Sequence, residues 1–372
     1  MIFAYGTFAQ DKEAKKEAKK ALMRDTLDGK FDFSRVLIDL KGFIPVPFII
    51  TEPALGSFGL AVAPLFIQRK NIPGFKGHLP PDITAGFGMF TVNGSWGIGG
   101  LRIGSFPKAG LKYRVGTGYF GINLSYYRTL PQVGEKEFAF NIKALPLLLS
   151  LSKKISQKSE IYLGMQYQFA KAQLTPKFKD TLPSFITKES LDQSTAALGG
   201  FVDWDIRDNI FTPDKGGRIN ILYAVNDQWT GSDFEYQMLN GSINWFSRIK
   251  PNWIAGFRTD VKHAFGDPPF YVLPSIEMRG IPLFRYQCYT TALLETEQRF
   301  DLKLRWSVVA FGGIGKAIEK NQSFSDAKNV YSVGTGFRYL IARAFKIRTG
   351  IDIAKGPDSF GWYIVFGHNW NR

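Results

Sequence analysis

Large apolar residues recur at every second position through most of the chain after residue 56. Between residues 161 and 169, apolar side chains at odd positions alternate with small or polar side chains at even positions. The same period runs through 218–225, 252–261 and 347–354, where arginine, asparagine or aspartate occurs on the second face. A period of two is the pattern of a β-strand with one apolar face. The sequence therefore predicts an all-β protein.

The polar face of these segments indicates which kind of sheet they form. Charged residues on strand after strand do not suit a sandwich, whose inner face is dry. They suit a transmembrane antiparallel β-barrel, which turns its apolar face to lipid and its polar face to a lumen. About fifteen segments have the pattern, and bacterial barrels have even strand numbers, so we expect sixteen strands with one segment missed or merged. The segments are 57–69, 82–92, 96–105, 109–121, 136–153, 158–172, 193–206, 217–225, 233–248, 252–265, 286–300, 303–314, 328–340, 344–355 and 359–370.

The predicted barrel occupies most of the chain. We expect residues 43–372 to form one outer-membrane barrel and residues 1–42 to be a residual signal and charged periplasmic segment. Residues 41–53 are rich in proline and apolar residues, and we expect them to pass under or into the barrel before its first strand.

The first residues resemble part of an export signal. Residues 1–9 end in Thr-Phe-Ala, as the tail of a signal peptide does, so we expect the gene to begin upstream or the chain to be exported another way. An ordinary disordered start is the alternative. Residues 11–24 combine helix-forming composition with charges all round, which predicts a solvated helix or tail.

Composition excludes several classes of protein. No apolar run approaches the roughly 18–20 residues of a membrane helix, which excludes a helical membrane protein. The net charge of +15 invites a nucleic-acid partner, yet the basic residues are spread along the chain without a recognition motif, so we expect none. Outer-membrane lipids and lipopolysaccharide are better partners for such cations. Cys288 is the only cysteine, which excludes an intrachain disulfide.

Candidate chemistry for an enzyme is missing from the sequence. The three histidines, His78, His263 and His368, lie in no recognisable Ser or Cys pairing motif. His368 is expected to be a membrane-interface residue of the last strand. We find neither metal-ligand spacing nor a phosphate loop, and we expect no catalytic residue, no metal and no cofactor.

The stretch 274–281 and the segment 291–300 after it place complementary charges together. Arg279 precedes Gly280 at a predicted loop tip, and Glu295, Glu297 and Arg299 follow at period two. This arrangement predicts a loop that folds back into the lumen. Further lumen charges are expected to form a structural lattice rather than a selectivity filter: Arg207, Arg258, Asp260, Arg338, Arg348 and Asp352.

The last predicted strand has large residues at alternate positions and an aromatic residue near the carboxyl end. We expect Trp362, Ile364, Phe366 and Trp370 to face the membrane, with the aromatics at its interface, and to form a C-terminal assembly signal. A strand built in this way can pair through its edge with an assembly machine.

Four motifs in order over residues 200–370 resemble the BamA/TamA superfamily of outer-membrane assembly barrels, also called the bacterial surface antigen family. Asp205-Ile206-Arg207-Asp208-Asn209, with Pro213 and Gly216-Gly217, is similar to its mid-barrel turn, and Met278-Arg279-Gly280-Ile281 to its inward loop. The runs 334–339 and 348–354, followed by the aromatic-ended last strand, are similar to its closing pattern. Residues 43–70 resemble the first strand of short members, so the resemblance covers nearly all of the chain.

The resemblance implies a loop inserted into a sixteen-stranded barrel and a seam between the first and last strands that opens laterally. The loop arginine of the family pairs with acidic residues of the wall, which by position are Glu297 and a second site that is Gly313 here. Ile281 replaces the usual aromatic residue. The loop attachment is therefore expected to be looser, or to use Glu295 in place of the second carboxylate.

The resemblance also implies a function and one departure from the family. Insertases of the family carry POTRA repeats, and only about 40 residues precede the barrel here, so we expect a barrel-only member that depends on a separate periplasmic or lipoprotein subunit. The first hypothesis is assembly, insertion or translocation of proteins or lipids at the bacterial outer membrane, with outer-membrane proteins as substrates. Its seam would be weakened by Gly56, Gly59, Gly361 and Gly367. The alternative is a passive or structural pore.

Overall fold

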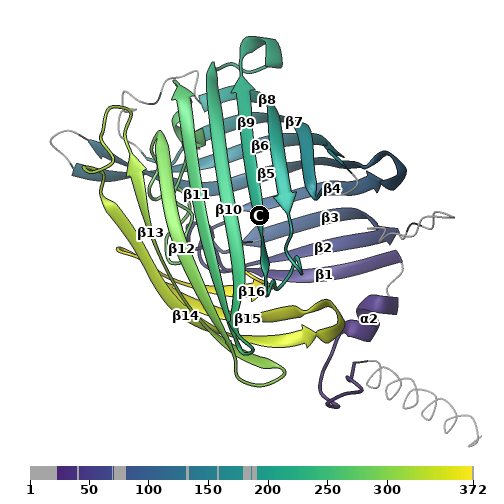
Figure 1. Cartoon of the computed structure of the whole chain (residues 1–372). Coiled ribbons are helices and arrows are strands. Elements are labelled where there is room, and N and C mark those ends of the chain that lie inside the picture. The colour runs from purple at the N-terminus through teal and green to yellow at the C-terminus, as the bar shows by residue number, and fades with distance from the viewer. Residues whose placement is uncertain are drawn as a thin grey trace, which may run out of the picture.

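The computed structural model describes residues 23–39, 42–68, 70, 81–130, 134–156, 159–178, 186 and 191–370. Within them, sixteen strands in chain order form one antiparallel sheet that curls into a nearly closed barrel (Figure 1). The strands are β1 (Gly42–Ile50), β2 (Gly59–Gln68), β3 (Asp82–Thr91), β4 (Trp96–Phe106), β5 (Leu111–Leu130), β6 (Gly134–Lys154), β7 (Ile161–Pro176), β8 (Asp192–Asp205), β9 (Gly216–Asn226), β10 (Tyr236–Lys250), β11 (Trp253–Gly266), β12 (Thr290–Asp301), β13 (Trp306–Ile318), β14 (Asn329–Ala342), β15 (Ile347–Lys355) and β16 (Phe360–Phe366).

In the part of the chain that the structure describes, helices are few and short. One α-helix, α2 (Ser34–Asp39), precedes β1, and the 3-10 turns are η1 (Pro53–Leu55), η2 (Pro107–Ala109), η4 (Gln228–Thr230), η5 (Phe270–Val272) and η6 (Arg343–Phe345). Over the described ranges, no helix is long and apolar enough to cross a membrane.

The predicted fold and strand number are confirmed, and the strand missing from the prediction is β1. Residues 41–53 were expected to pass under or into the barrel, which is wrong, because Gly42–Ile50 pair with β2 along their whole length. The prediction failed because Pro45 and Pro47 interrupt the pattern of a central strand. The predicted signal remnant and nearly all of the predicted helix at 11–24 lie outside the described residues, and the division at residue 42 stays a prediction.

The two prolines of β1 are tolerated because of the side to which their nitrogens point. Pro45 lies directly opposite Pro64 of β2, and neither has an N–H to donate, so this cannot be a hydrogen-bonded pair. Alternate residues of a strand direct their N–H groups to opposite sides. The nitrogens of Pro45 and Pro47 therefore face away from β2, towards the free edge of β1.

The strands separate an apolar outer face from a lumen, as the period of two predicted. Leu163 and Met165 on β7 are 50 % and 59 % exposed on the outside, whereas Phe138 and Phe140 on β6 pack inward against Phe270. The inward side chains of β3 to β10 are largely apolar or small, and those of β11 to β15 include most of the charges.

The chain between β11 and β12, residues 267–289, folds into the lumen, and we call it the inserted loop. Its residues Ile276, Met278 and Ile281 are buried against Leu293 of β12 and Val330 of β14. Ile281, which stands where the family's aromatic residue would be, thus belongs to an apolar cluster that holds the loop inside the barrel.

The last strand is shorter than predicted. β16 ends at Phe366, and Gly367 adopts a positive φ of 72° while its N–H still pairs with Arg348. Trp370 then lies inside the barrel, 3 % exposed, and donates its indole N–H to Glu295 at 3.0 Å. Trp370 and the buried His368 are therefore not membrane-interface residues. The alternation of apolar and polar residues does not reveal that the strand ends at Phe366, because the conformation of Gly367 leaves no signal in that pattern.

Candidate functional site

The tip of the inserted loop places a guanidinium among three carboxylates of the barrel wall. Arg279 lies 2.7 Å from Glu297 and 3.3 Å from Glu295 on β12, and 2.6 Å from Asp352 on β15. Its guanidinium carbon lies 3.4 Å from the ring centroid of Phe311 on β13. Its side chain is only 1 % exposed, so these charges interact with little screening by water.

The contacts extend the expected set of partners. The hydrogen bonds of Arg279 go to Asp352 and Glu295, while the contact with Glu297 lacks hydrogen-bond geometry. Gly313 supplies no carboxylate. A Cβ added to Gly313 would lie 2.7 Å from the sulfur of Met278, which therefore occupies the space of a side chain at this position. The expected ion pair of Arg279 with Glu297 is present, and so is the expected use of Glu295 in place of the missing acid. Asp352, expected only as one charge of the lattice, adds a third carboxylate from another strand, so the attachment does not lack a second acid.

Backbone contacts bind the loop tip to the strands that end the chain. Gly280 has a φ of 84° and donates its N–H to the hydroxyl of Tyr363 on β16 at 2.8 Å. Its carbonyl accepts from Ser359 in the β15–β16 turn. A Cβ on Gly280 would lie 2.9 Å from the nitrogen of Gly356. Only glycine fits this position, for conformation and for space.

The edges of the sheet are β1 and β16, and the gap between them is the seam. Within the described ranges, no strand pairing joins these two edges. The bond from the N–H of Gly367 to Arg348 fixes the alternation along β16, so Phe360, Trp362, Ile364 and Phe366 direct their backbone groups to the seam. The edge of β16 keeps these donors, whereas β1 lacks two donors because of its prolines.

This comparison corrects the predicted cause of weak pairing at the seam. Gly56 caps η1 and Gly59 opens β2, so neither belongs to a seam strand. Gly361 directs its backbone towards β15, and Gly367 lies beyond β16. Prolines rather than glycines therefore weaken the seam.

Side chains bridge the seam at the end where β1 stops. The inserted loop is bound to β16 through Gly280, and three residues later Leu283 donates its N–H to Glu52 at 3.2 Å. Glu52 lies two residues after the end of β1 and caps η1. A segment of four residues in the loop thus contacts both edges.

A second bridge lies at the opposite end, where β1 begins. Residues 23–39, which we call the N-terminal segment, bring Asp25, Asp28 and Asp32 within 2.5, 2.7 and 2.7 Å of Arg305 in the β12–β13 turn. Arg305 is 2 % exposed. Asp25 also pairs with Arg343, between β14 and β15, at 2.5 Å. The segment that leads into β1 is therefore attached to strands on the other side of the seam.

These ion pairs lower the pKa values of the acids in the N-terminal segment. Hydrogen bonds from the Arg343 guanidinium hold the pKa of Asp25 well below its ordinary value, against the opposing effect of burial. Burial alone would raise the pKa of Asp32, but hydrogen bonds from Ser34 and Arg305 lower it overall. Both carboxylates are ionised at neutral pH, which keeps the bridge intact.

The remaining predicted lumen charges form local pairs. Arg258 lies 2.9 Å from Glu295 and also pairs with Asp260, and Arg338 pairs with Asp352. Arg348 lies 3.4 Å from Asp301, whereas Arg207 lies in the turn after β8, 2.7 Å from Asp205. The lattice thus continues from the loop tip around the charged half of the wall, and its role stays a prediction. Sequence reasoning missed Arg305 and its three acids, whose separation of more than 250 residues leaves no local signal.

Comparison with known proteins agrees with this architecture. A model of the Omp85 superfamily domain matches residues 110–271. BamA from Haemophilus ducreyi lacking POTRA domains 1-3 aligns over 95 % of this chain and 81 % of its own, with a TM-score of 0.58 and 12 % identity. CdiB from Escherichia coli aligns over 87 % and 62 %, with a TM-score of 0.61 and 11 % identity.

A second CdiB, from Acinetobacter baumannii, aligns over 87 % of this chain and 58 % of its own, with a TM-score of 0.52 and 9 % identity. The chain thus spans less than two thirds of either CdiB chain. No curated protein sequence matches it. At identities this low, the structural similarity shows that the chains share a barrel fold and nothing beyond the fold.

Proposed function

Because a model of the Omp85 superfamily domain matches residues 110–271, we propose that the chain belongs to this superfamily and is a barrel of the bacterial outer membrane that inserts or translocates other polypeptides by parting β1 from β16. The observation that carries the proposal is the seam. Its two edges have no ladder between them in the described part of the chain, and a few side chains bridge it at each end. Such bridges can break and re-form without unfolding a strand.

The two edges differ in what they can offer to a substrate. An extended polypeptide adds to a sheet through backbone hydrogen bonds, which need donors and acceptors at the edge. β16 keeps the N–H groups of Phe360, Trp362, Ile364 and Phe366, while β1 lacks those of Pro45 and Pro47. We therefore expect an incoming strand to pair first with β16.

The alternative of a passive pore has less support. The inserted loop holds buried side chains in the charged half of the lumen, and Arg279 at its tip is 2 % exposed. An open conduit for solutes would need this loop to leave. As partners we propose unfolded outer-membrane proteins as substrates, a separate periplasmic or lipoprotein subunit, and the surrounding lipids and lipopolysaccharide.

Depletion of the protein tests this function. We expect broad loss of other barrels from the outer membrane, measured by quantitative proteomics, and recovery when the wild-type chain is supplied. Unchanged barrels together with altered solute uptake would instead support the pore.

Two variants test which edge receives the substrate. Ile364→Pro removes one donor from the free edge of β16 and is expected to prevent recovery, whereas the control Ile364→Ala keeps that donor and restores it. Heat-modifiable migration on gels shows whether each variant assembles as a barrel. Recovery by an assembled Ile364→Pro barrel would contradict pairing at β16.

A further inference from the structure

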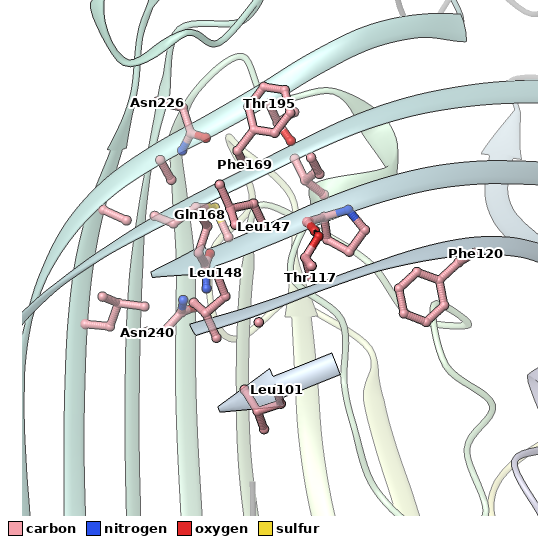
Figure 2. A pocket seen from close by; sticks show the side chains of 18 of the residues that line it. Leu101, Thr117, Phe120, Leu147, Leu148, Gln168, Phe169, Thr195, Asn226 and Asn240 are labelled. Carbon is pink, nitrogen blue, oxygen red and sulfur yellow. The ribbon is translucent and has the colours of Figure 1, made fainter. Parts of the chain in front are cut away.

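An apolar cavity of about 580 Å³ lies inside the barrel, away from the seam (Figure 2). Leu101, Leu148, Leu222 and Met238 line it from four strands, and Val272 of the inserted loop closes part of it. Its volume falls within the roughly 300–1,000 Å³ of small-molecule sites. Barrel lumens are generally polar, so this lining needs an explanation.

A second hollow, a groove of about 630 Å³, lies on the outer face behind the cavity. Val62, Ile98 and Leu145 line it and are 47 % to 61 % exposed. The groove and the cavity share Phe87, Gly100 and Thr117 as lining residues, and the two hollows therefore meet at one patch of the wall.

Prolines interrupt the strand pairing on both sides of this patch. Between β2 and β3, pairing stops after Val62 and resumes at Leu65, which leaves out Pro64. Between β5 and β6, the positions opposite Leu145 and Pro146 are unpaired, although the hydroxyl of Thr117 reaches the carbonyl of Pro146 at 2.9 Å. A central strand rarely contains proline, because proline removes a ladder hydrogen bond. The groove spans the wall from one interruption to the other.

Glycines make the wall thin between the two interruptions. A Cβ on Gly99 would lie 2.5 Å from the ring of Phe87, and one on Gly118 would lie 2.7 Å from the ring of Phe120. The two rings stack with their centroids 5.6 Å apart. Two aromatic rings thus cover a glycine-rich wall from the inside, where larger side chains would exclude them.

We propose that the apolar cavity binds an acyl chain of a bilayer phospholipid, which enters from the outer groove through the wall between Pro64 and Pro146. The groove faces lipid if the barrel lies in a bilayer, and an acyl chain needs no hydrogen-bond partners. A polypeptide brings backbone N–H and C=O groups, for which the lining offers few partners beyond Gln168, Asn226 and Asn240. The inference rests on the proposed membrane location but not on opening of the seam.

Photolabelling of the whole chain in nanodiscs tests this inference. The nanodiscs contain phosphatidylethanolamine with a diazirine near the end of one acyl chain, and mass spectrometry maps the adducts after illumination. We expect adducts on the inward residues Leu101 and Leu148 as well as on the outward residues Ile98 and Leu145. Ala170→Phe, which fills the cavity from β7, is expected to abolish the inward adducts only. Leu163→Phe, on the outer face of the same strand, is the control and leaves both sets unchanged.

Restoring the missing donor tests the route. Pro146→Ala supplies an N–H for the β5–β6 ladder, and we expect slower inward labelling with normal outward labelling. Outward adducts without inward adducts would overturn the inference while leaving the membrane location intact. Inward adducts that survive in Ala170→Phe would also overturn it, and inward labelling by a photoreactive unfolded polypeptide but not by lipid would assign the cavity to protein substrates. Absence of both sets of adducts would contradict the membrane location and this inference together.

Discussion

Removal of the Arg279 guanidinium is expected to release the tip of the inserted loop. In Arg279→Ala, Asp352 keeps Arg338 and Glu295 keeps Arg258, but Glu297 pairs with no other cation in the described part of the chain. Breaking a buried ion pair on one side typically costs about 3–5 kcal/mol, because a buried charge is left uncompensated. The docking equilibrium of the loop should therefore fall by roughly two to four orders of magnitude.

Hydrogen–deuterium exchange of the amides at 276–283, measured on assembled barrel in nanodiscs, reports this change directly. Arg279→Lys keeps the charge but loses the planar fork, so we expect a smaller increase in exchange. The matched control is Arg285→Ala in the same loop, whose partners Glu135 and Asp358 are about half exposed, and which should cost roughly 0–1 kcal/mol. Equal exchange in Arg279→Ala and Arg285→Ala would refute the view that the loop is held by its buried charges.

Three other predictions concern the seam. Arg305→Ala removes the common partner of the acids in the N-terminal segment, so a protease should cleave that segment faster than in the wild type. Lys303→Ala changes an exposed residue of the same turn, and in this control the cleavage rate should equal that of the wild type. The attachment of this segment should also depend on pH: because its acids have lowered pKa values in the folded state, it is fully present above the ordinary carboxyl pKa of about 3.9 and is lost as the pH falls below that value. A spin label at Leu27, 66 % exposed, in a Cys288→Ser background should become mobile as the pH falls through the lowered pKa values of these acids, and a mobility that does not rise anywhere below the ordinary carboxyl pKa would contradict the ion pairing. Pro45→Ala should strengthen closure by about 0.5–1.5 kcal/mol through one new hydrogen bond across the seam, and an unchanged exchange rate of the β16 edge amides would argue against this.

The fold could be predicted because a membrane barrel repeats one local rule on each strand. Apolar and polar positions alternate from β2 to β16, and turns occur at short intervals. β1 was not predicted as a strand because its nine residues include Pro45 and Pro47, and proline normally interrupts a strand. Only the pairing of Pro45 with Pro64 shows that the missing donors face an unpaired edge.

The site was predicted only in part, since its completion depends on residues far apart in sequence. The motif around Arg279 indicated an inserted loop and acidic partners on β12. The contribution of Asp352, 73 residues later, could not be derived from an empty position at Gly313. Trp370 was misplaced because β16 ends at Phe366 and Gly367 adopts a positive φ, so that Trp370 lies inside the barrel and not on the expected outer face.

The central claim is that β1 and β16 part during function, and a reversible cross-link across the seam tests it most directly. Cysteines at Ile49 and Phe360 in a Cys288→Ser background, joined by a reducible bifunctional reagent, would hold the two edges together in proteoliposomes. We predict that the cross-linked barrel fails to insert an unfolded outer-membrane protein, that reduction restores insertion, and that either single-cysteine variant inserts normally. Undiminished insertion by the fully cross-linked barrel would contradict the account.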